Sequence, residues 1–358
     1  MHCLNKIHNN GKEVQIKLYP SSDVELIDRD EWQNLQDNSL FNNPFFEYWN
    51  LVPAIKNLSI SNKPVWIAAI YYEDAMIGLF PITKKYQGYI IPTCCIWSHD
   101  HCYLSTPLLS LRLNFHEVMT AISIHLNCYF SHIPLHDKTL INASKCNNIF
   151  EFTYQRAVIN NSQSIKHHLT QLSGKKKREI YREKKNIETL GEVILKKFSC
   201  VEEGLSEYKK LEISGWKGKE GGAILSRPEV SNYYQDISIL SNGNIDIHGL
   251  FINDALVACT IRVKSKDKYY EIKTTYNEEM RKFAPGKIME LYILEDLLLH
   301  NPTYVDSCTD QDNKLINWLW PDKKEFVTRY IFSQNTKSQI LKLTYTFKQW
   351  FRKTFIHA

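Results

Sequence analysis

Hydrophobic positions in residues 14–150 switch between strand-like and helix-like spacing. Runs such as "VQIKLY" (14–19) and "GYIIPTCCIW" (88–97) have the β-branched and aromatic content of strands. In "VWIAAIYYEDAMIGLFPITKKY" (65–86) two strand-like runs meet at Glu73 and Asp74, which predicts a hairpin. A turn followed by a helix is predicted in the segment 21–41, and helices are predicted in 42–58 (opening at Pro44) and 114–126. A mixed α/β unit is expected here.

A second pattern begins after about residue 155 with a long basic helix that Gly191 ends. The apolar residues that keep helical spacing in it are Ile165, Leu169, Leu172, Ile180, Ile187 and Leu190. A strand, "EVILKKFS" (192–199), comes next. Two helices are then predicted around "VEEGLSEYKKLEIS" (201–214) and "PEVSNYYQDISILS" (228–241).

Three strand-like runs follow, and only pairs of turn residues separate them. This pattern predicts a three-stranded antiparallel meander. The strands are 245–252, 255–265 and 269–277, and the turns lie at Asn253 and Asp254 and at Lys266 and Asp267.

The stretch "RKFAPGKIME" (281–290) connects the meander to an apolar helix from about Gly286 to His300, which Asn301 and Pro302 close. A further strand, a short helix and a last strand are predicted at 303–308, 313–320 and 325–333.

Length and composition indicate two packed domains. The chain has 358 residues, of which 43% are hydrophobic and 12% aromatic, so it can bury two cores. We place one domain at residues 1–155, a second at 156–335 and a carboxyl-terminal amphipathic helix at 336–358. No period of about 20–50 residues repeats, which excludes solenoids and propellers.

Cysteine usage and hydropathy predict a cytoplasmic protein. Nine cysteines without regular spacing do not form a secreted disulfide framework. The first residues lack an apolar core of signal-peptide length, and no apolar run approaches the roughly 20 residues of a membrane span. The helix at 336–358 mixes Trp and Phe with Lys and Arg, so it either packs on the domain or lies peripherally on the inner membrane.

Basic charge is concentrated in one segment. The net charge is only +5, but residues 166–197 hold ten Lys or Arg against four Glu. Such a run is either a solvated helix face or a surface for an acidic partner.

The order of elements in residues 156–335, with a Gly-bearing loop between the third meander strand and a helix, resembles the GNAT superfamily of N-acetyltransferases. The loop of that fold carries Gln or Arg, two residues, Gly, one residue, then Gly or Ala, and Arg281, Ala284 and Gly286 stand at those positions. Free N–H groups at such a helix N-terminus suit a pyrophosphate. Two departures weaken the pattern: Ala284 replaces the usual Gly, and Pro285 has no N–H.

Longer motifs resemble the acyltransferases related to CelD of cellulose biosynthesis. They are "SGKKKREIYREKKNIETLGEV", "LEISGWKGKEGGAIL", "YYEIKTTYNEEMRKFAPGKIMELYI" and "VDSCTDQDNKLINWLWPDKK", together with "MIGLFPI", "CIWSHDH" and "STPLL" in the first half. The resemblance covers about residues 40–333 and implies two tandem GNAT-like domains, similar to the Fem-type aminoacyl transferases. Each domain would be an α/β (α+β) unit with a mixed, mostly antiparallel sheet flanked by helices, and the second would be the active one.

The resemblance implies an acyl-CoA co-substrate held by the loop residues Arg281, Phe283, Ala284, Gly286 and Lys287. Acyl transfer also needs a base for the nucleophile, donors for the oxyanion and an acid for the leaving thiolate.

Three residues are candidates for this chemistry. Glu271 lies on the strand that leads to the loop, where the resemblance places a base; the alternative is a cross-strand ion pair with Lys264 or Lys273. Asp306 ends the next strand, at an edge that borders clefts in α/β sheets, but it also suits a helix cap. Tyr276 is either the acid for the thiolate or a packed aromatic residue.

Five residues are candidates for substrate binding. Trp216 and Lys217 lie in the Gly-rich segment 214–223, which the resemblance places beside the acceptor or the pantetheine; a surface loop anchored by Trp216 is the alternative. Lys273 is assigned with them. Arg178 and Arg182 of the basic helix could meet phosphates of coenzyme A, an acyl carrier protein or tRNA.

No metal is expected. "CCIWSHDHC" (94–102) offers thiols and imidazoles, but no second cluster has the spacing of a structural zinc site. Cys308 is not expected to form an acyl-enzyme, because no base is paired with it in the sequence.

The sequence therefore predicts an N-acyltransferase that moves an acyl group from a thioester to an amine or hydroxyl of a small-molecule or lipid-like acceptor by direct attack. A Fem-like transferase that uses aminoacyl-tRNA and an inactive binding scaffold are the alternatives.

Overall fold

A computed structural model describes residues 2–4, 7–9, 11–59, 63–87, 91–128, 130–135, 149–309, 312–332, 336, 338–340 and 342–344. The chain forms two compact units, of which unit 1 comprises Met1–Tyr154 and Glu325–Ala358, and unit 2 comprises Gln155–Lys324. Unit 1 therefore takes the last strand, which the sequence assigned to the second domain.

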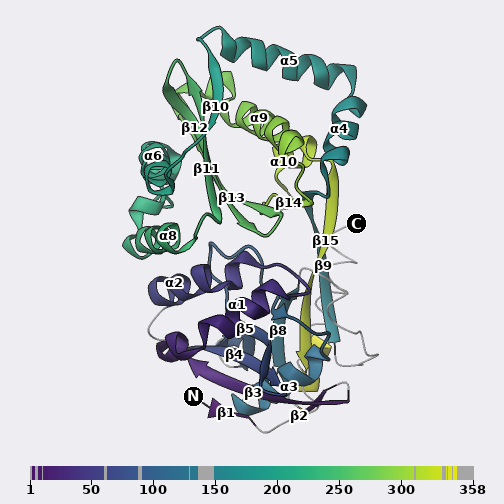
Figure 1. Ribbon diagram of the computed structural model, residues 1–358. Helices are drawn as coiled ribbons and strands as arrows, with labels where there is room; N and C mark the ends of the chain where they lie inside the picture. The colour runs from purple at the N-terminus through teal and green to yellow at the C-terminus, as the bar shows by residue number, and fades with distance from the viewer. Residues whose placement is uncertain are drawn as a thin grey trace. The chain divides into compact units, whose positions relative to one another are not determined.

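Unit 1 is built on a mostly antiparallel sheet (Figure 1). β4 (Val65–Tyr72) and β5 (Ala75–Gln87) form the predicted hairpin, with left-handed φ angles of 49° at Glu73 and 64° at Asp74 in its turn. The other strands are β1 (His2–Cys3), β2 (Ile7–Asn9), β3 (Lys12–Pro20), β6 (Ile91–Ile96), β7 (Leu108–Leu109), β8 (Phe130–Leu135) and the end of β15 (Asp322–Phe332). Among the described strands of unit 1, only β6 and β8 pair in parallel.

The predicted helices of unit 1 form, and one of them is split. They are α1 (Arg29–Asp37), α2 (Tyr48–Leu58) and α3 (Phe115–His125), with 3-10 turns η1 (Ser21–Leu26) and η2 (Pro44–Phe46). The segment that the sequence opened at Pro44 thus begins as a 3-10 turn, because the extended Glu47 separates it from α2.

Unit 2 contains the predicted meander at the centre of its sheet. β11 (Ile245–Ile252), β12 (Ala255–Ser265) and β13 (Lys268–Tyr276) are antiparallel, and β10 (Val193–Lys197) pairs with β11. On the other side β13 pairs in parallel with β14 (Tyr304–Asp306), which pairs antiparallel with the end of β9 (Ile149–Ile159). Both meander turns lie where the sequence predicted them, with positive φ at Asn253, Asp254 and Lys266.

The sequence predicted one long basic helix, and this prediction is wrong. The structure divides it into α4 (Ser162–Gln171) and α5 (Gly174–Glu188). Leu172 has φ −55° and ψ 135°, which breaks the helix, and the hydroxyl of Ser173 accepts the Lys176 N–H and so caps α5. Local capping overrides the apolar periodicity at this point.

The remaining helices of unit 2 cover both faces of its sheet. α6 (Val201–Ser214) and α8 (Pro228–Leu240) lie on one face, and α9 (Pro285–His300) and α10 (Lys314–Leu319) lie on the other (Figure 1). The short elements α7 (Trp216–Lys219), η4 (Ile224–Ser226) and η5 (Glu278–Phe283) connect them. The segment 214–223, predicted as a loop, therefore contains one helical turn.

α9 supplies much of the core of unit 2. Ile288, Met289, Ile293 and Leu294 are buried against the sheet and α10. Each such side chain contributes up to about 1.5–3 kcal/mol through burial. Asn301 ends the helix in a left-handed conformation, as the sequence predicted.

Among the described helices, none combines the length and the apolar character that a bilayer span requires. Of the tail helix predicted at 336–358, residues 345–358 lie outside the described part of the chain.

Candidate functional site

β13 and β14 begin as a pair and then separate. Their parallel pairing covers three residues of each strand and ends at Tyr270 and Asp306, whereas β13 continues to Tyr276. Among the described residues no strand pairs with this edge of β13 beyond Tyr270. The edge from Glu271 onward therefore offers backbone N–H and C=O groups to an extended ligand.

Asp306 is the last residue of β14, at the point where β14 separates from β13. Its carboxylate is fully buried. Its Oδ1 contacts Arg156 Nη1 at 3.2 Å and accepts the Cys308 N–H at 2.8 Å, while Oδ2 accepts the Tyr304 hydroxyl at 3.1 Å. Cys308 takes a left-handed φ of 51°. These contacts make Asp306 an anchor for the turn that opens the strand edge.

The loop with the GNAT-like pattern forms a tight turn at the N-terminus of α9. Ala284 has φ 52° and ψ 47°, so Ala replaces Gly at a left-handed position. The amides of Lys287 and Ile288 already donate to the Ala284 carbonyl at 3.0 and 3.1 Å, and Pro285 has no N–H. Gly286 therefore supplies the first amide N–H of α9 that a ligand can use.

Gly286 also lies against Tyr276. A Cβ added at Gly286 would stand 3.3 Å from Cδ1 of Tyr276, so the glycine lets the turn approach the end of β13 closely. The structure thus brings the predicted Tyr276 and Gly286 together. Arg281 is exposed in the same loop, and Phe283 is half-buried against the core.

Lys287 ties the loop to the basic helix α5. Its Nζ contacts Glu179 at 2.8 Å and Glu183 at 2.7 Å, and it lies 4.4 Å from the ring centre of Trp318. The Lys287 ammonium lowers the pKa of the Glu179 carboxyl. Arg178 and Arg182 are exposed on the same helix. Glu179 and Glu183 of α5 therefore hold Lys287, while Arg178 and Arg182 of the same helix are exposed to a ligand.

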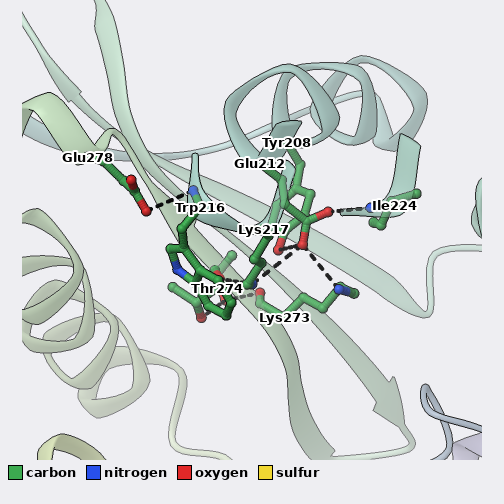
Figure 2. A network of polar contacts seen from close by, with 9 residues as sticks. Tyr208, Glu212, Trp216, Lys217, Ile224, Lys273, Thr274 and Glu278 are labelled. Carbon is green, nitrogen blue, oxygen red and sulfur yellow. Dashed lines mark hydrogen bonds and ion pairs between the residues drawn. The ribbon is translucent and has the colours of Figure 1, made fainter. Parts of the chain in front are cut away.

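On the α6 face of the sheet, Glu212 organises a network that Figure 2 shows. Its buried Oε1 contacts Lys273 Nζ at 3.1 Å and Lys217 Nζ at 3.4 Å and accepts the Tyr208 hydroxyl at 3.3 Å. Its Oε2 accepts the Ile224 N–H at 2.7 Å. Both oxygens are satisfied, so one carboxylate positions two lysines beside β13.

Lys217 and its neighbour Trp216 connect this network to the end of β13 (Figure 2). The Lys217 ammonium also donates to the Thr274 carbonyl on β13 at 3.0 Å, and the Trp216 N–H donates to Glu278 at 2.9 Å. These residues line a small cavity of about 30 Å³ together with Tyr276. Burial, and then the neighbouring Lys273, lower the pKa of Lys217. The structure therefore brings the predicted Trp216, Lys217, Lys273 and Tyr276 to one place.

Glu271 faces the opposite side of the sheet, because a β-bulge between Ile261 and Arg262 changes the register. Arg262 stands directly across from Glu271, whereas Lys273 pairs with Ile261. Burial raises the pKa of Glu271 to about 7, and Arg262 acts in the opposite direction. The ion pair with Lys264 or Lys273 that the sequence left open does not form.

A larger cavity of about 210 Å³ lies on the α9 face, near the end of that helix. Arg262 and His248 line it, and Arg262 Nη2 contacts Asp296 Oδ2 at 3.2 Å and His248 Nε2 at 2.9 Å. Burial, and then Arg262, lower the pKa of His248 well below its usual value, so the imidazole stays neutral.

Within the described residues, no group of three His, Cys, Asp or Glu side chains is arranged to hold a metal ion. Burial lowers the pKa of His99 to about 3 and raises that of Cys102 to about 12. Burial also raises the pKa of Cys308, which keeps its thiol protonated and weakly nucleophilic.

The sequence reasoning missed three buried charged residues: Glu212, Glu290 and Arg262. Periodicity could have found them. Glu212 continues the buried stripe of Leu205 and Tyr208 at helical spacing, and Arg262 interrupts a strand that is otherwise almost continuously buried.

Comparison with known proteins identifies the fold. Residues 174–314 match the family model described as an acetyltransferase (GNAT) domain. The sequence matches none of the curated proteins.

Three solved structures share the fold over most of both chains. The crystal structure of FemX has a TM-score of 0.53 and 10% identity, covering 84% of this chain and 96% of its own. The C-terminal domain of a putative lysylphosphatidylglycerol synthetase from Agrobacterium fabrum has a TM-score of 0.55, 10% identity and coverages of 88% and 94%. A conserved protein of unknown function from Bacteroides thetaiotaomicron has a TM-score of 0.55, 11% identity and coverages of 87% and 98%.

At such low identity these similarities concern the fold. They confirm the predicted α/β fold class. Together with the family model over residues 174–314, they support the predicted resemblance to the GNAT superfamily in a Fem-like arrangement. Residues 174–314 of unit 2 are therefore similar to a GNAT acetyltransferase domain, in a chain that shares the fold of FemX.

Proposed function

We propose that the chain is an acyltransferase that moves an acyl group from acyl-CoA to an amine or hydroxyl acceptor. The observation that carries this proposal is the open edge of β13. It starts where β14 leaves at Tyr270 and leads to the turn at Gly286. The amides of a pantetheine arm can pair with such an edge as an added strand would.

The phosphates of the donor would lie at the other end of this path. The free Gly286 amide at the N-terminus of α9 and the exposed Arg281 suit a pyrophosphate. Arg178 and Arg182 on α5, which Lys287 ties to this loop, add exposed guanidinium groups for a further phosphate. Lys287 itself is occupied by two glutamates and would shape the loop rather than bind the donor.

Glu271 is our candidate for the general base. Its Oε1 has no hydrogen-bond partner, and its pKa of about 7 suits proton transfer near neutral pH. The candidate acid for the leaving thiolate is the hydroxyl of Tyr276, whose ring lies against the Gly286 turn. Asp306, whose carboxylate has three partners, would hold the strand edge open.

The acceptor would enter from the α6 face, where Trp216 is half exposed beside Lys217. Its nucleophile would reach Glu271 on the α9 face past the open edge of β13. The indole offers an apolar contact and the lysine a cation, so an acceptor with both apolar and polar parts fits this side. A small molecule and a lipid-like amphiphile both meet this description. The narrower resemblance to CelD-related enzymes agrees with either acceptor.

A second candidate is a transferase that takes an aminoacyl group from tRNA, as the Fem-type enzymes do. The specific observation that favours it is the loop: Ala284 and Pro285 leave few amides for a pyrophosphate, while α5 presents exposed basic residues. The shared fold with FemX is compatible with this alternative.

Binding experiments separate the two candidates. Acetyl-CoA and longer acyl-CoA at about 100 times Kd should stabilise the protein by about 2.7 kcal/mol in a thermal-shift assay. Gly286→Trp should abolish this shift by blocking the turn. Leu299→Trp, at the exposed far end of the same helix, is the matched control and should keep it.

Stabilisation by tRNA with a steep salt dependence, and none by any acyl-CoA, would instead support the aminoacyl transferase. Binding of acyl-CoA without release of free thiol in the presence of acceptors would identify an inactive scaffold. An acyl carrier protein as donor would show as thiol release from acylated carrier protein alone.

A further inference from the structure

The α9 face of the unit 2 sheet buries a group of polar atoms that lack hydrogen-bond partners. They are Glu271 Oε1, Glu290 Oε2, Arg262 Nε and Nη1, and Trp320 Nε1. Each of these residues is more than nine-tenths buried. Polar atoms in a core are normally bonded, so four such residues together call for a functional explanation.

The fold brings these residues together from three elements and the chain after α10. Arg262 on β12 stands opposite Glu271 on β13, and α9, which packs on both strands, carries Glu290. Burial, and then the charge of Glu271, raise the pKa of Glu290. The two carboxyl groups therefore sense each other in a region that water does not reach.

The charges in this region do not balance if both carboxyl groups are ionised. Arg262 is the only cation beside them among the described residues, and its Nη2 already contacts Asp296. Two further carboxylates would leave three negative charges against one buried positive charge. Burying an uncompensated charge costs several kcal/mol, so one carboxyl group must stay protonated.

We propose that Glu271 and Glu290 hold one proton between them, that Glu290 keeps it, and that Arg262 balances the single negative charge on Glu271. Glu290 is then a positioning residue: as a neutral acid it lets Glu271 gain and lose its charge without a second buried anion. The role of Glu271 as the base rests on the proposed function, whereas the shared proton does not.

The surroundings of the two groups agree with this assignment. Burial is the largest cause that raises both pKa values, and Glu271 adds to the increase at Glu290, which lies well above its usual value. Glu271 faces Arg262 from β12, Glu290 from α9 and the protonated thiol of Cys308 from the turn after β14. Behind Arg262 lie Asp296 and the neutral His248. Arg262 is the one group that favours the ionised form at both sites.

The larger cavity lies beside Arg262. Its lining includes Arg262, His248 and Asp296, and it lies at the end of α9 that is far from Gly286. Neither Glu271 nor Glu290 lines this cavity, so Arg262 stands between it and the two carboxyl groups.

Infrared spectroscopy of the full chain tests the proposal directly. At about pH 8, far above the ordinary carboxyl pKa of about 4, the wild type should show the carbonyl band of a buried protonated carboxylic acid. Glu290→Gln should lose this band, and Glu271→Gln should keep it. Glu295→Gln, an exposed change on the same helix, should leave the spectrum unchanged.

Kinetics test the part played by Arg262. Removing one close opposite charge shifts a carboxyl pKa by about 1–3 units, so Arg262→Met should move the acidic limb of the pH–rate profile up by that amount. Arg262→Lys keeps the charge and should restore most of the wild-type profile. Glu290→Gln mimics the neutral acid and should move the limb by less than about half a unit.

The outcomes separate the two claims. Absence of the band in the wild type, or its persistence in Glu290→Gln, would overturn the shared proton. A clear fall of the acidic limb in Glu290→Gln would mean that Glu290 is charged in the active protein, which also overturns it. If the band behaves as expected but Glu271→Gln transfers acyl groups at the wild-type rate, the shared proton stands and Glu271 is not the base.

Discussion

Two buried glutamates on opposite sides of β13, Glu212 on α6 and Glu271 on the strand itself, have different surroundings. Glu212 on the α6 face has four donors within 3.4 Å, two of them cationic. Glu271 on the α9 face has an oxygen without a partner, one Arg across the strand and a second carboxyl group nearby.

The difference shows how the two faces of one sheet can give two buried carboxyl groups different tasks. A carboxylate that accepts from four donors fixes the side chains around it. A carboxyl group in an apolar, poorly bonded site changes charge near neutral pH. The bulge at Ile261 decides which residue of β13 meets which environment, since it turns Glu271 to α9 and Lys273 to α6.

The largest effect on stability is expected at Glu212. Glu212→Ala leaves the Lys217 and Lys273 ammonium groups without their shared counter-charge and should reduce the free energy of unfolding by about 3–5 kcal/mol. Urea denaturation followed by tryptophan fluorescence measures this. Glu207→Ala on the exposed side of α6 is the control and should change stability by less than about 0.5 kcal/mol. A loss below about 1 kcal/mol for Glu212→Ala would show that the network is not a structural centre.

The next effect is a pH dependence of the free energy of unfolding, which arises from Glu271 on the α9 face. The pKa of Glu271 is about 7 in the folded chain and near 4.5 when unfolded, so the folded state binds more protons between these values. Stability is therefore complete below about pH 4.5 and is lost as the pH rises through about 7, at up to about 1.4 kcal/mol per pH unit.

Glu271→Gln should flatten this slope, which thermal denaturation between about pH 5 and 8 measures. Glu290 extends the loss of stability to higher pH, because its pKa in the folded chain is well above the usual value. Glu290→Gln should therefore flatten the alkaline part of the curve. An unchanged slope in Glu271→Gln would mean that this carboxyl group is ionised throughout the range.

Much of the fold was predictable because local patterns determine it. The meander strands and their turns at Asn253 and Lys266 follow from alternation and turn residues, and the structure confirms them. The single basic helix was not predicted correctly, since the apolar spacing runs through Ser173 although its hydroxyl begins a new helix there. Capping is a local signal that outweighs periodicity.

The candidate site was predictable only where neighbouring segments form it. The loop at Ala284 and the segment around Trp216 are visible as Gly-rich stretches, and the structure brings Trp216 to Lys273. Helical spacing places Glu212 on the buried stripe of α6, but the lysines that it holds come from other segments, and the role of Glu290 depends on tertiary burial. The face that Glu271 occupies depends on a one-residue bulge, which composition does not reveal.

A smaller effect is expected at Lys217. Lys217→Met leaves Glu212 with Lys273, Tyr208 and the Ile224 amide, so only one of its donors is lost, and the Thr274 carbonyl loses its ammonium partner. We expect a loss of about 1–3 kcal/mol in the free energy of unfolding, less than for Glu212→Ala. Urea denaturation compares the two variants directly. If Lys217→Met lost more stability than Glu212→Ala, Lys217 and not Glu212 would be the residue on which the network depends.

The smallest effect is expected where an ion pair is exposed. Lys196 and Asp254 contact each other at 3.3 Å, close to the 3.4 Å between Lys217 and Glu212, but their side chains are 48% and 93% exposed. Water screens this pair, so Lys196→Met should change the free energy of unfolding by less than about 0.5 kcal/mol. The same denaturation assay measures it, and the change from Lys to Met is identical to that at Lys217. If both variants lose the same stability, distance alone governs these pairs, and burial does not distinguish the Glu212 network from the surface.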